Sequence, residues 1–172
     1  MRRLALLRHA KSSWDDSNLD DFDRPLNARG LQAAPVMGAV LASLNFSPDC
    51  ILCSPAERTR QTLTSIKPTI RGAMPPVSFD QSLYLAGTAD ILALLRKVEP
   101  QHAKVLIIGH NPGLHALAAM LAATGDANQI ARLEDKFPTA SLAVYTFPQS
   151  TWHEFDPASG QLDAFITPKD RA

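Results

Sequence analysis

Three short apolar runs recur along the chain, at residues 4–7, 50–53 and 105–108. Stretches in which apolar side chains repeat with helical spacing lie between them. Strands that are apolar at almost every position are typical of a parallel sheet that helices cover on both faces. The pattern therefore predicts an α/β fold, a three-layer sandwich with a mostly parallel central sheet.

Local start and stop signals predict the boundaries of the other elements. Asn27 is an acceptable N-cap for the first helix, and Pro35 indicates either a kink or a late start. Further helices are predicted from Ser54 onward, over 88–98 and over 112–123, with Gly125 as the stop of the last one. Strands are predicted at 141–147 and 161–167, with a weaker candidate at 151–155.

The length of 172 residues, 45% of them hydrophobic, fits one domain over residues 1–172. Lys plus Arg and Asp plus Glu each number 17, so no overall charge favours nucleic acid or an anionic membrane as a partner. The N-terminal apolar run is too short for a secretory signal, and no long apolar run follows. We expect a soluble, cytoplasmic protein.

Polar residues follow each apolar run. The first run is followed by Arg8 and His9, the second by residues 54–58, and the third by residues 109–112. In an open parallel sheet, ligands bind beyond the carboxyl ends of the strands, so these segments are expected to converge. The polar stretch at 15–26 is too long for a simple connection and is a candidate to cover a site.

The segment after the second run indicates an anion site. Ser54 fits an N-cap, Pro55 the first helical position, and Glu57 completes a capping box. Arg58 then falls in the first turn, where the helix dipole disfavours a cation unless an anion binds there. An ion pair between Arg58 and a surface carboxylate is the alternative.

Two arginines and two histidines around one helix N-terminus fit a phosphoryl group. Guanidinium groups bind phosphoryl oxygens in a forked geometry and stay charged at any working pH. A neutral histidine can attack phosphorus and carry the phosphoryl group as a covalent intermediate. His9 and His110 both follow core strands, whereas His102, His115 and His153 do not and are interpreted as structural.

A metal site is the competing use of two histidines. No carboxylates stand beside them at ligand spacing, and neighbouring arginines would repel a divalent ion, so no metal is expected. The only cysteines, Cys50 and Cys53, lie inside an apolar run rather than at the start of a helix. We interpret them as small buried residues and not as a redox or metal-binding pair.

Three motifs resemble the histidine phosphatase superfamily, which has the phosphoglycerate mutase-like fold: LLRHA at 6–10, SPAERTRQT at 54–62 and GHNPGL at 109–114. The segments DDFDRPLNARG at 20–30 and FPTASLAV at 137–144 resemble the SixA-type phosphohistidine phosphatases within it. The resemblance implies a phosphatase that works without metal or organic cofactor.

The resemblance also implies roles for individual residues. His9 would be the nucleophile that becomes phosphorylated, with Arg8, Arg58 and His110 as the phosphate pocket. Lys11, Arg24 and Thr139 are further candidates for the pocket, with solvated loop side chains as the alternative.

Two positions depart from the family pattern. Ala10 stands where the family has glycine, and alanine is small enough that we expect little loss. No glutamate occurs in residues 79–90, where many members supply a general acid. Asp80 is the nearest candidate acid, with Asp90 behind it, although a turn or cap role is the alternative. A site without an acid favours phosphohistidine, because imidazole is a better leaving group than an alkoxide.

The sequence therefore predicts hydrolysis of phosphohistidine on a phosphorylated protein partner. One alternative is a phosphomonoesterase that acts on a small phosphorylated molecule at the same site. Another is a non-catalytic module that binds phosphate or docks a partner, which the missing acid favours. A dinucleotide-binding domain is excluded because no G-x-G-x-x-G follows the first strand.

Overall fold

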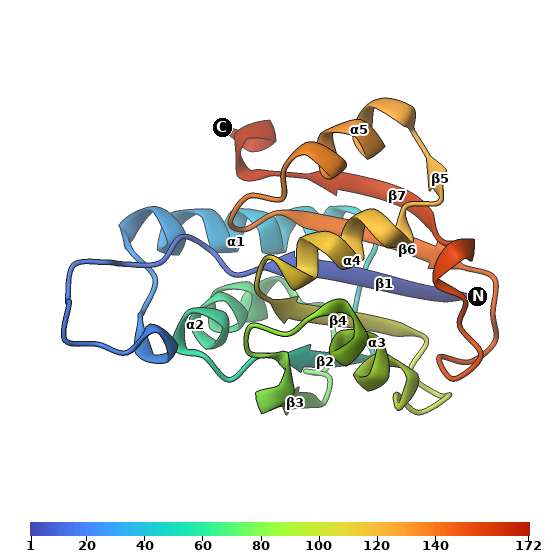
Figure 1. The fold of residues 1–172 in the computed structure, drawn as a ribbon, viewed down its shortest axis with the longest axis horizontal. Helices are drawn as coiled ribbons and strands as arrows, with labels where there is room; N and C mark the ends of the chain where they lie inside the picture. Colours follow the sequence, from blue (N-terminus) through green and yellow to red (C-terminus); the bar gives the residue numbers. More distant parts are fainter.

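The fold is built on a seven-stranded mixed sheet, and a computed structural model describes residues 1–172 (Figure 1). The strands are β1 (Arg2–Arg8), β2 (Cys50–Cys53), β3 (Val77–Phe79), β4 (Lys104–Gly109), β5 (Thr124–Gly125), β6 (Leu142–Phe147) and β7 (Gln161–Ile166). Their order is β3-β2-β4-β1-β6-β7-β5. Strands β3, β2, β4 and β1 run parallel, β6 is antiparallel to both its neighbours, and β5 is parallel to β7. The prediction of a mostly parallel sheet is confirmed.

Helices cover both faces of the sheet. They are α1 (Ala28–Ser43), α2 (Glu57–Ile66), α3 (Thr88–Arg96), α4 (Gly113–Leu121) and α5 (Ala127–Asp135). Short 3-10 turns are η1 (Asp21–Asp23), η2 (Lys67–Thr69), η3 (Gln81–Leu83), η4 (Pro157–Ser159) and η5 (Pro168–Arg171). The apolar side chains of α1 and α2 pack in one core, and those of α3, α4 and α5 pack in the other. The three-layer sandwich is therefore confirmed. None of the helices is both long and apolar enough to cross a bilayer.

Strand β1 lies at the centre of the sheet and contributes side chains to both apolar cores. Leu4 and Leu6 belong to the core under α3 and α4, and Ala5 and Leu7 belong to the core under α1 and α2. Burying each leucine contributes roughly 1.5–3 kcal/mol, so a strand covered on both sides needs apolar residues at successive positions. Because β1 is central, its last residue, Arg8, lies in the middle of the sheet edge at which the parallel strands end.

Helix α1 begins as predicted. The Asn27 side chain accepts a hydrogen bond from the backbone N–H of Gly30 at 2.9 Å, which satisfies one of the free donors of the first turn. The helix then continues through Pro35 from Ala28, so the late start is wrong. The helices predicted over 88–98 and 112–123 are also confirmed, as α3 and α4, each a few residues shorter.

The predicted capping box at Ser54 is wrong. Helix α2 begins at Glu57, its N-cap is Ala56, and no side chain caps it. The Ser54 hydroxyl instead bonds to the ring of His110, and the Glu57 carboxylate accepts from the Gln61 side chain. Arg58 nevertheless lies in the first turn of α2, as the sequence predicts.

Three elements of the C-terminal half differ from the sequence prediction. Gly125 does not simply stop a helix but lies in strand β5, at a φ of 147°. Residues 151–155 form no strand. Trp152 is fully buried there, and its ring N–H donates to the carbonyl of His102 at 2.7 Å, which accounts for an apolar pattern without a strand. Helix α5 was not predicted and is capped by Asp126, whose side chain accepts from the N–H of Gln129.

Candidate active site

The carboxyl ends of β1, β4 and β2 lie side by side and bring the three polar segments together. A cavity of about 350 Å³ opens at this edge. Its lining includes all four predicted site residues, Arg8, His9, Arg58 and His110. The long loop after β1, drawn in blue at the left of Figure 1, reaches past this edge and also contributes to the lining.

The ring of His9 is fixed by its own neighbour in the chain. Its Nδ1 lies 2.7 Å from the carbonyl oxygen of Ala10. Because a carbonyl oxygen only accepts, Nδ1 must carry the proton, and Nε2 is left with a free lone pair. The Ala10 N–H donates in turn to the Thr62 hydroxyl of α2 at 3.0 Å. Ala10 has no positive φ, so alanine fits where the family has glycine.

Both histidines of the cavity have lowered pKa values. Burial lowers the pKa of His9 to about 3, although its hydrogen bond to Ala10 acts in the opposite direction. The pKa of His110 is also lowered to about 3, by burial first and then by the charge of Arg58. Both imidazoles are therefore neutral at physiological pH, the form in which a histidine can act as a nucleophile.

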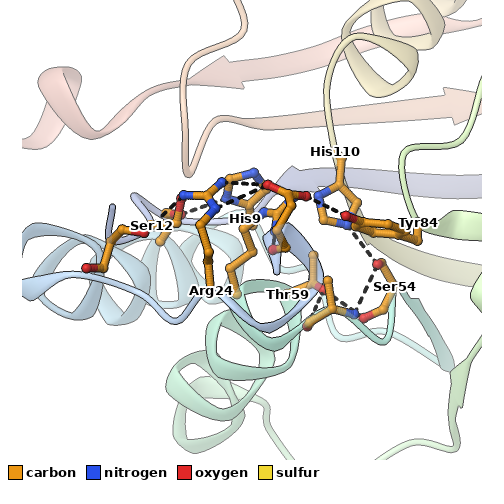
Figure 2. A network of polar contacts seen from close by, with 12 residues as sticks. His9, Ser12, Arg24, Ser54, Thr59, Tyr84 and His110 are labelled. Carbon is orange, nitrogen blue, oxygen red and sulfur yellow. Dashed lines mark hydrogen bonds and ion pairs between the residues drawn. The ribbon is translucent and has the colours of Figure 1, made fainter. Parts of the chain in front are cut away.

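The ring of His110 is oriented by Ser54, at the end of β2. Its Nε2 lies 2.7 Å from the Ser54 hydroxyl, and this oxygen also accepts a hydrogen bond from the N–H of Ala56 (Figure 2). Since the hydroxyl accepts from Ala56, it can donate its own proton to Nε2 of the neutral ring. This arrangement leaves the proton of His110 on Nδ1, which is buried and has no partner.

Asp21, in turn η1, joins the long loop to the cavity. Its carboxylate accepts from Arg58 at 3.0 Å and from Arg24 at 3.0 and 3.1 Å, and its carbonyl accepts from Arg58 at 2.7 Å. The Tyr84 hydroxyl also donates to this carboxylate (Figure 2). Burial alone would raise the pKa of Asp21, but the bonds from Tyr84, Arg24 and Arg58 outweigh it and lower the pKa to about 2. Asp21 is therefore an anion in the cavity.

Three buried nitrogens of the cavity residues have no hydrogen-bond partner: Nε of Arg8, Nε of Arg58 and Nδ1 of His110. Buried donors without a partner are rare, because each loses its hydration without compensation. Burial and the charge of Arg58 also lower the pKa of Arg8, as expected for two crowded cations. An anion bound between Arg8 and Arg58 would offset this repulsion.

The other candidate residues are placed differently. Lys11 and Thr139 line the cavity, and neither side chain makes a hydrogen bond within the protein. Arg24 also lines it, but all of its nitrogens are engaged by Asp21, Ser12 and Ser13, so it anchors the loop. Asp80 is not among the lining residues, and its carboxylate accepts from the N–H and hydroxyl of Ser82 at the start of η3.

Comparisons with known proteins agree with this geometry. The family model described as histidine phosphatase superfamily (branch 1) matches residues 4–83. The crystal structure of SixA from Agrobacterium tumefaciens, assigned as a phosphohistidine phosphatase, is 31% identical with a TM-score of 0.79, covering 97% of this chain and 98% of that one. The chain belongs to the histidine phosphatase superfamily.

Other relatives also match nearly all of the chain of this histidine phosphatase. A SixA structure from Nakamurella multipartitia is 29% identical with a TM-score of 0.81, covering 97% of this chain and 96% of that one. An uncharacterized protein of Mycobacterium tuberculosis is 33% identical over 165 residues, 95% of this chain and all of that protein. The fold, the family and the SixA-like character are thus established, and the protein is a phosphatase.

Sequence reasoning missed part of the candidate active site and of the contacts around it. Asp21 is one of five aspartates in residues 15–23, and nothing local distinguishes it from the others. Tyr84 was not singled out either, because its contact to Asp21 joins residues 63 positions apart. Asn111 lies in the cavity lining, and its amide donates to the carbonyl of Phe137. The motif GHNPGL was the only signal for Asn111.

Proposed function

We propose that this phosphatase hydrolyses phosphohistidine on a protein partner, with His9 as the nucleophile. The observation that carries the proposal is the orientation of His9. The Ala10 carbonyl holds its Nδ1 proton and leaves Nε2 free, and His9 lines a cavity together with Arg8, Arg58 and His110. A nucleophile beside donors for an anion is what phosphoryl transfer requires.

The reaction divides into two displacements at phosphorus. In the first, Nε2 of His9 forms a bond to phosphorus while the bond to the substrate imidazole breaks, and the leaving nitrogen takes a proton from solvent. In the second, a water oxygen attacks the phosphohistidine of the enzyme, the bond to Nε2 breaks, and phosphate leaves. Arg8, Arg58 and His110 hold the equatorial oxygens in both steps.

The preference for phosphohistidine rests on the absence of an acid. Asp21 is the only carboxylate that lines the cavity, and its pKa of about 2 leaves it without a proton to donate at neutral pH. Asp80 lies outside the lining and caps η3. An alkoxide leaving group needs a proton donor, whereas an imidazole leaves with weaker assistance.

The rim of the cavity supports a substrate on a protein surface. Trp14 is 72% exposed and Leu85 is 52% exposed, and both line the cavity. The guanidinium of Arg24 lies 3.5 Å from the centre of the Trp14 ring and holds this side chain in place. Large exposed apolar side chains beside a polar pocket suit contact with another protein, since they would gain little from a small polar phosphate.

The test compares phosphate release from a phosphohistidine peptide and from p-nitrophenyl phosphate, without added metal. We expect wild type to favour the peptide and His9→Ala to lose at least about a thousandfold in kcat on both substrates. His153→Ala, which removes an exposed histidine, is the matched control and should retain wild-type rates.

Trapping of the intermediate adds a second readout. Wild type mixed with labelled peptide should carry an acid-labile, base-stable phosphoryl group that His9→Ala lacks. Efficient hydrolysis of simple phosphate esters with none of the peptide would replace the proposal by a small-molecule phosphomonoesterase. Binding of inorganic phosphate with no turnover of either substrate would indicate the docking module.

A further inference from the structure

A second hollow, of about 430 Å³, lies where the start of α1, the end of α5 and turn η5 meet. In Figure 1, α5 and the C-terminal end of the chain lie together beyond β6 and β7. Four of the side chains that line it are cationic: Arg29, Arg132, Lys136 and Lys169. Asp135 is its only acidic residue. We call this hollow the basic groove.

Most of this positive charge is not neutralised within the protein. Arg132 forms an ion pair with Asp170 at 2.8 Å. Arg29, Lys136 and Lys169 have no carboxylate within ion-pair distance, and all three are exposed. The whole chain has equal numbers of acidic and basic residues. The positive charge of the groove is therefore a local excess and does not reflect a net positive charge of the protein.

The basic groove adjoins the catalytic cavity. Thr139 lines both. Lys136 directly precedes Phe137, whose carbonyl accepts hydrogen bonds from Arg8 at 3.1 Å and Asn111 at 2.8 Å. A ligand that extends from the nucleophile over Thr139 would therefore enter the groove.

The start of α1, which forms another side of the groove, also packs against a residue of the catalytic cavity. Gly30, next to Arg29, packs so closely on Lys11 that a Cβ there would lie 2.2 Å from the Lys11 carbonyl oxygen. Lys11 itself lines the catalytic cavity. The backbone next to the groove's cations is thus anchored to the phosphate pocket on both sides.

We propose that the basic groove binds acidic side chains of the phosphorylated protein while its phosphohistidine occupies the pocket at His9. This inference rests on the proposed function and names the kind of partner it acts on. The cations stand on three separate elements and are exposed, so they suit long-range attraction to an acidic surface. A fixed subsite for one small anion would instead use buried, oriented donors like those of the catalytic cavity.

The test uses two phosphohistidine peptides, one flanked by glutamates and one by glutamines, with p-nitrophenyl phosphate as a third substrate. The variant is Arg29→Gln, Lys136→Gln and Lys169→Gln combined. The control combines Lys67→Gln, Arg71→Gln and Arg96→Gln, which removes the same charge from exposed cations that line neither hollow.

At low ionic strength we expect the groove variant to lose at least about tenfold in kcat/KM on the acidic peptide. Its values on the neutral peptide and on p-nitrophenyl phosphate should stay within about twofold of wild type, and the tenfold difference should shrink in high salt. The control should match wild type on all three substrates. Equal losses on both peptides, or no loss on either, would overturn the assignment.

A binding measurement separates this inference from the proposed function. A fluorescent acidic peptide with glutamine in place of phosphohistidine should bind wild type and bind the groove variant at least about tenfold more weakly. If wild type hydrolyses p-nitrophenyl phosphate but neither phosphohistidine peptide, the proposed function fails while this binding still reports on the groove. Equal binding by wild type and groove variant would refute the groove itself.

Discussion

Each histidine of the candidate active site uses one ring nitrogen for orientation and keeps the other free. His9 is held through Nδ1 by a backbone carbonyl, and His110 is held through Nε2 by the Ser54 hydroxyl. A carbonyl fixes the tautomer of His9 absolutely, whereas a hydroxyl can either donate or accept. His9 is therefore restricted to one chemical role, and His110 can adjust its proton to the ligand.

The lowered pKa values of the two rings predict how they respond to acid. We expect imidazole NMR signals of His9 and His110 to show the neutral form from pH 7 down to about 4, because both pKa values lie near 3. Assignment comes from His9→Gln and His110→Gln. A titration midpoint near the ordinary value of 6.5 in the free protein would contradict this expectation.

The lowered pKa values of His9 and His110 also make the free energy of unfolding depend on pH. In the unfolded chain both rings take up protons near pH 6.5, but in the folded chain only near pH 3. The unfolded state binds more protons between these values, so the free energy of unfolding falls as pH drops through this window. Urea unfolding should therefore show a larger loss between pH 7 and 5 for wild type than for the double His9→Gln, His110→Gln variant.

At the residue scale, the sequence predicted which side chains gather in the cavity better than it predicted which residues those side chains contact. The motifs around Arg8, His9, Arg58 and His110 predicted residues that the fold brings into one cavity. Ser54 was predicted as a helix cap from its neighbours, but its hydroxyl bonds to a ring 56 positions away. A local pattern cannot show such a partner, and for the same reason Asp21 was missed.

At the element scale, the site depends on how closely helices approach the loops beside it. Helix α4 follows the strand that ends next to His110, and its first residue is Gly113. A Cβ on Gly113 would lie 1.7 Å from the carbonyl oxygen of Ala86, in the loop that carries Tyr84 and Leu85. The absence of a side chain at Gly113 lets α4 pack directly against that loop.

Gly113→Ala should therefore lower the free energy of unfolding by about 3 kcal/mol, since backbone atoms on one side must move. The matched control is Gly87→Ala, where a Cβ would meet nothing within 4 Å. It should cost about 1 kcal/mol or less, the difference between glycine and alanine at an N-cap. Urea unfolding measures both, and similar values for the two variants would refute the packing argument.

At the scale of the whole molecule, the sheet separates two apolar cores, and strand β2 contributes a cysteine to each. Cys50 packs in the core with α3 and α4, and Cys53 in the core with α1 and α2. Side chains three positions apart on a strand point to opposite faces, so the two thiols cannot form a disulfide. Both are free and buried, and the C-x-x-C spacing follows from the sandwich rather than from redox chemistry.

These thiols should be unreactive until the protein unfolds. Burial raises the pKa of Cys50 to about 11 and that of Cys53 to about 12, so almost no thiolate exists at pH 8. We expect no reaction with Ellman's reagent in the native protein and release of two equivalents in guanidinium chloride. Rapid labelling of either cysteine under native conditions would contradict the burial.

The apolar runs predicted the layered architecture because a strand buried on both faces leaves a strong signal in sequence. The C-terminal half was less predictable. Trp152 and Phe155 are buried in a segment without a strand, and the two-residue strand β5 is too short for any periodicity. There, contacts between distant segments override the local pattern.

The order of the strands also bears on how the protein behaves in a crowded solution. The outermost strands are the shortest, with three residues in β3 and two in β5, whereas β1 lies fourth of seven with a partner on each side. Backbone groups at an open sheet edge can recruit a strand of another chain and begin aggregation. Because the longest strand, β1, is central and the two outermost strands are the shortest, the sheet offers little unpaired backbone to a neighbouring molecule.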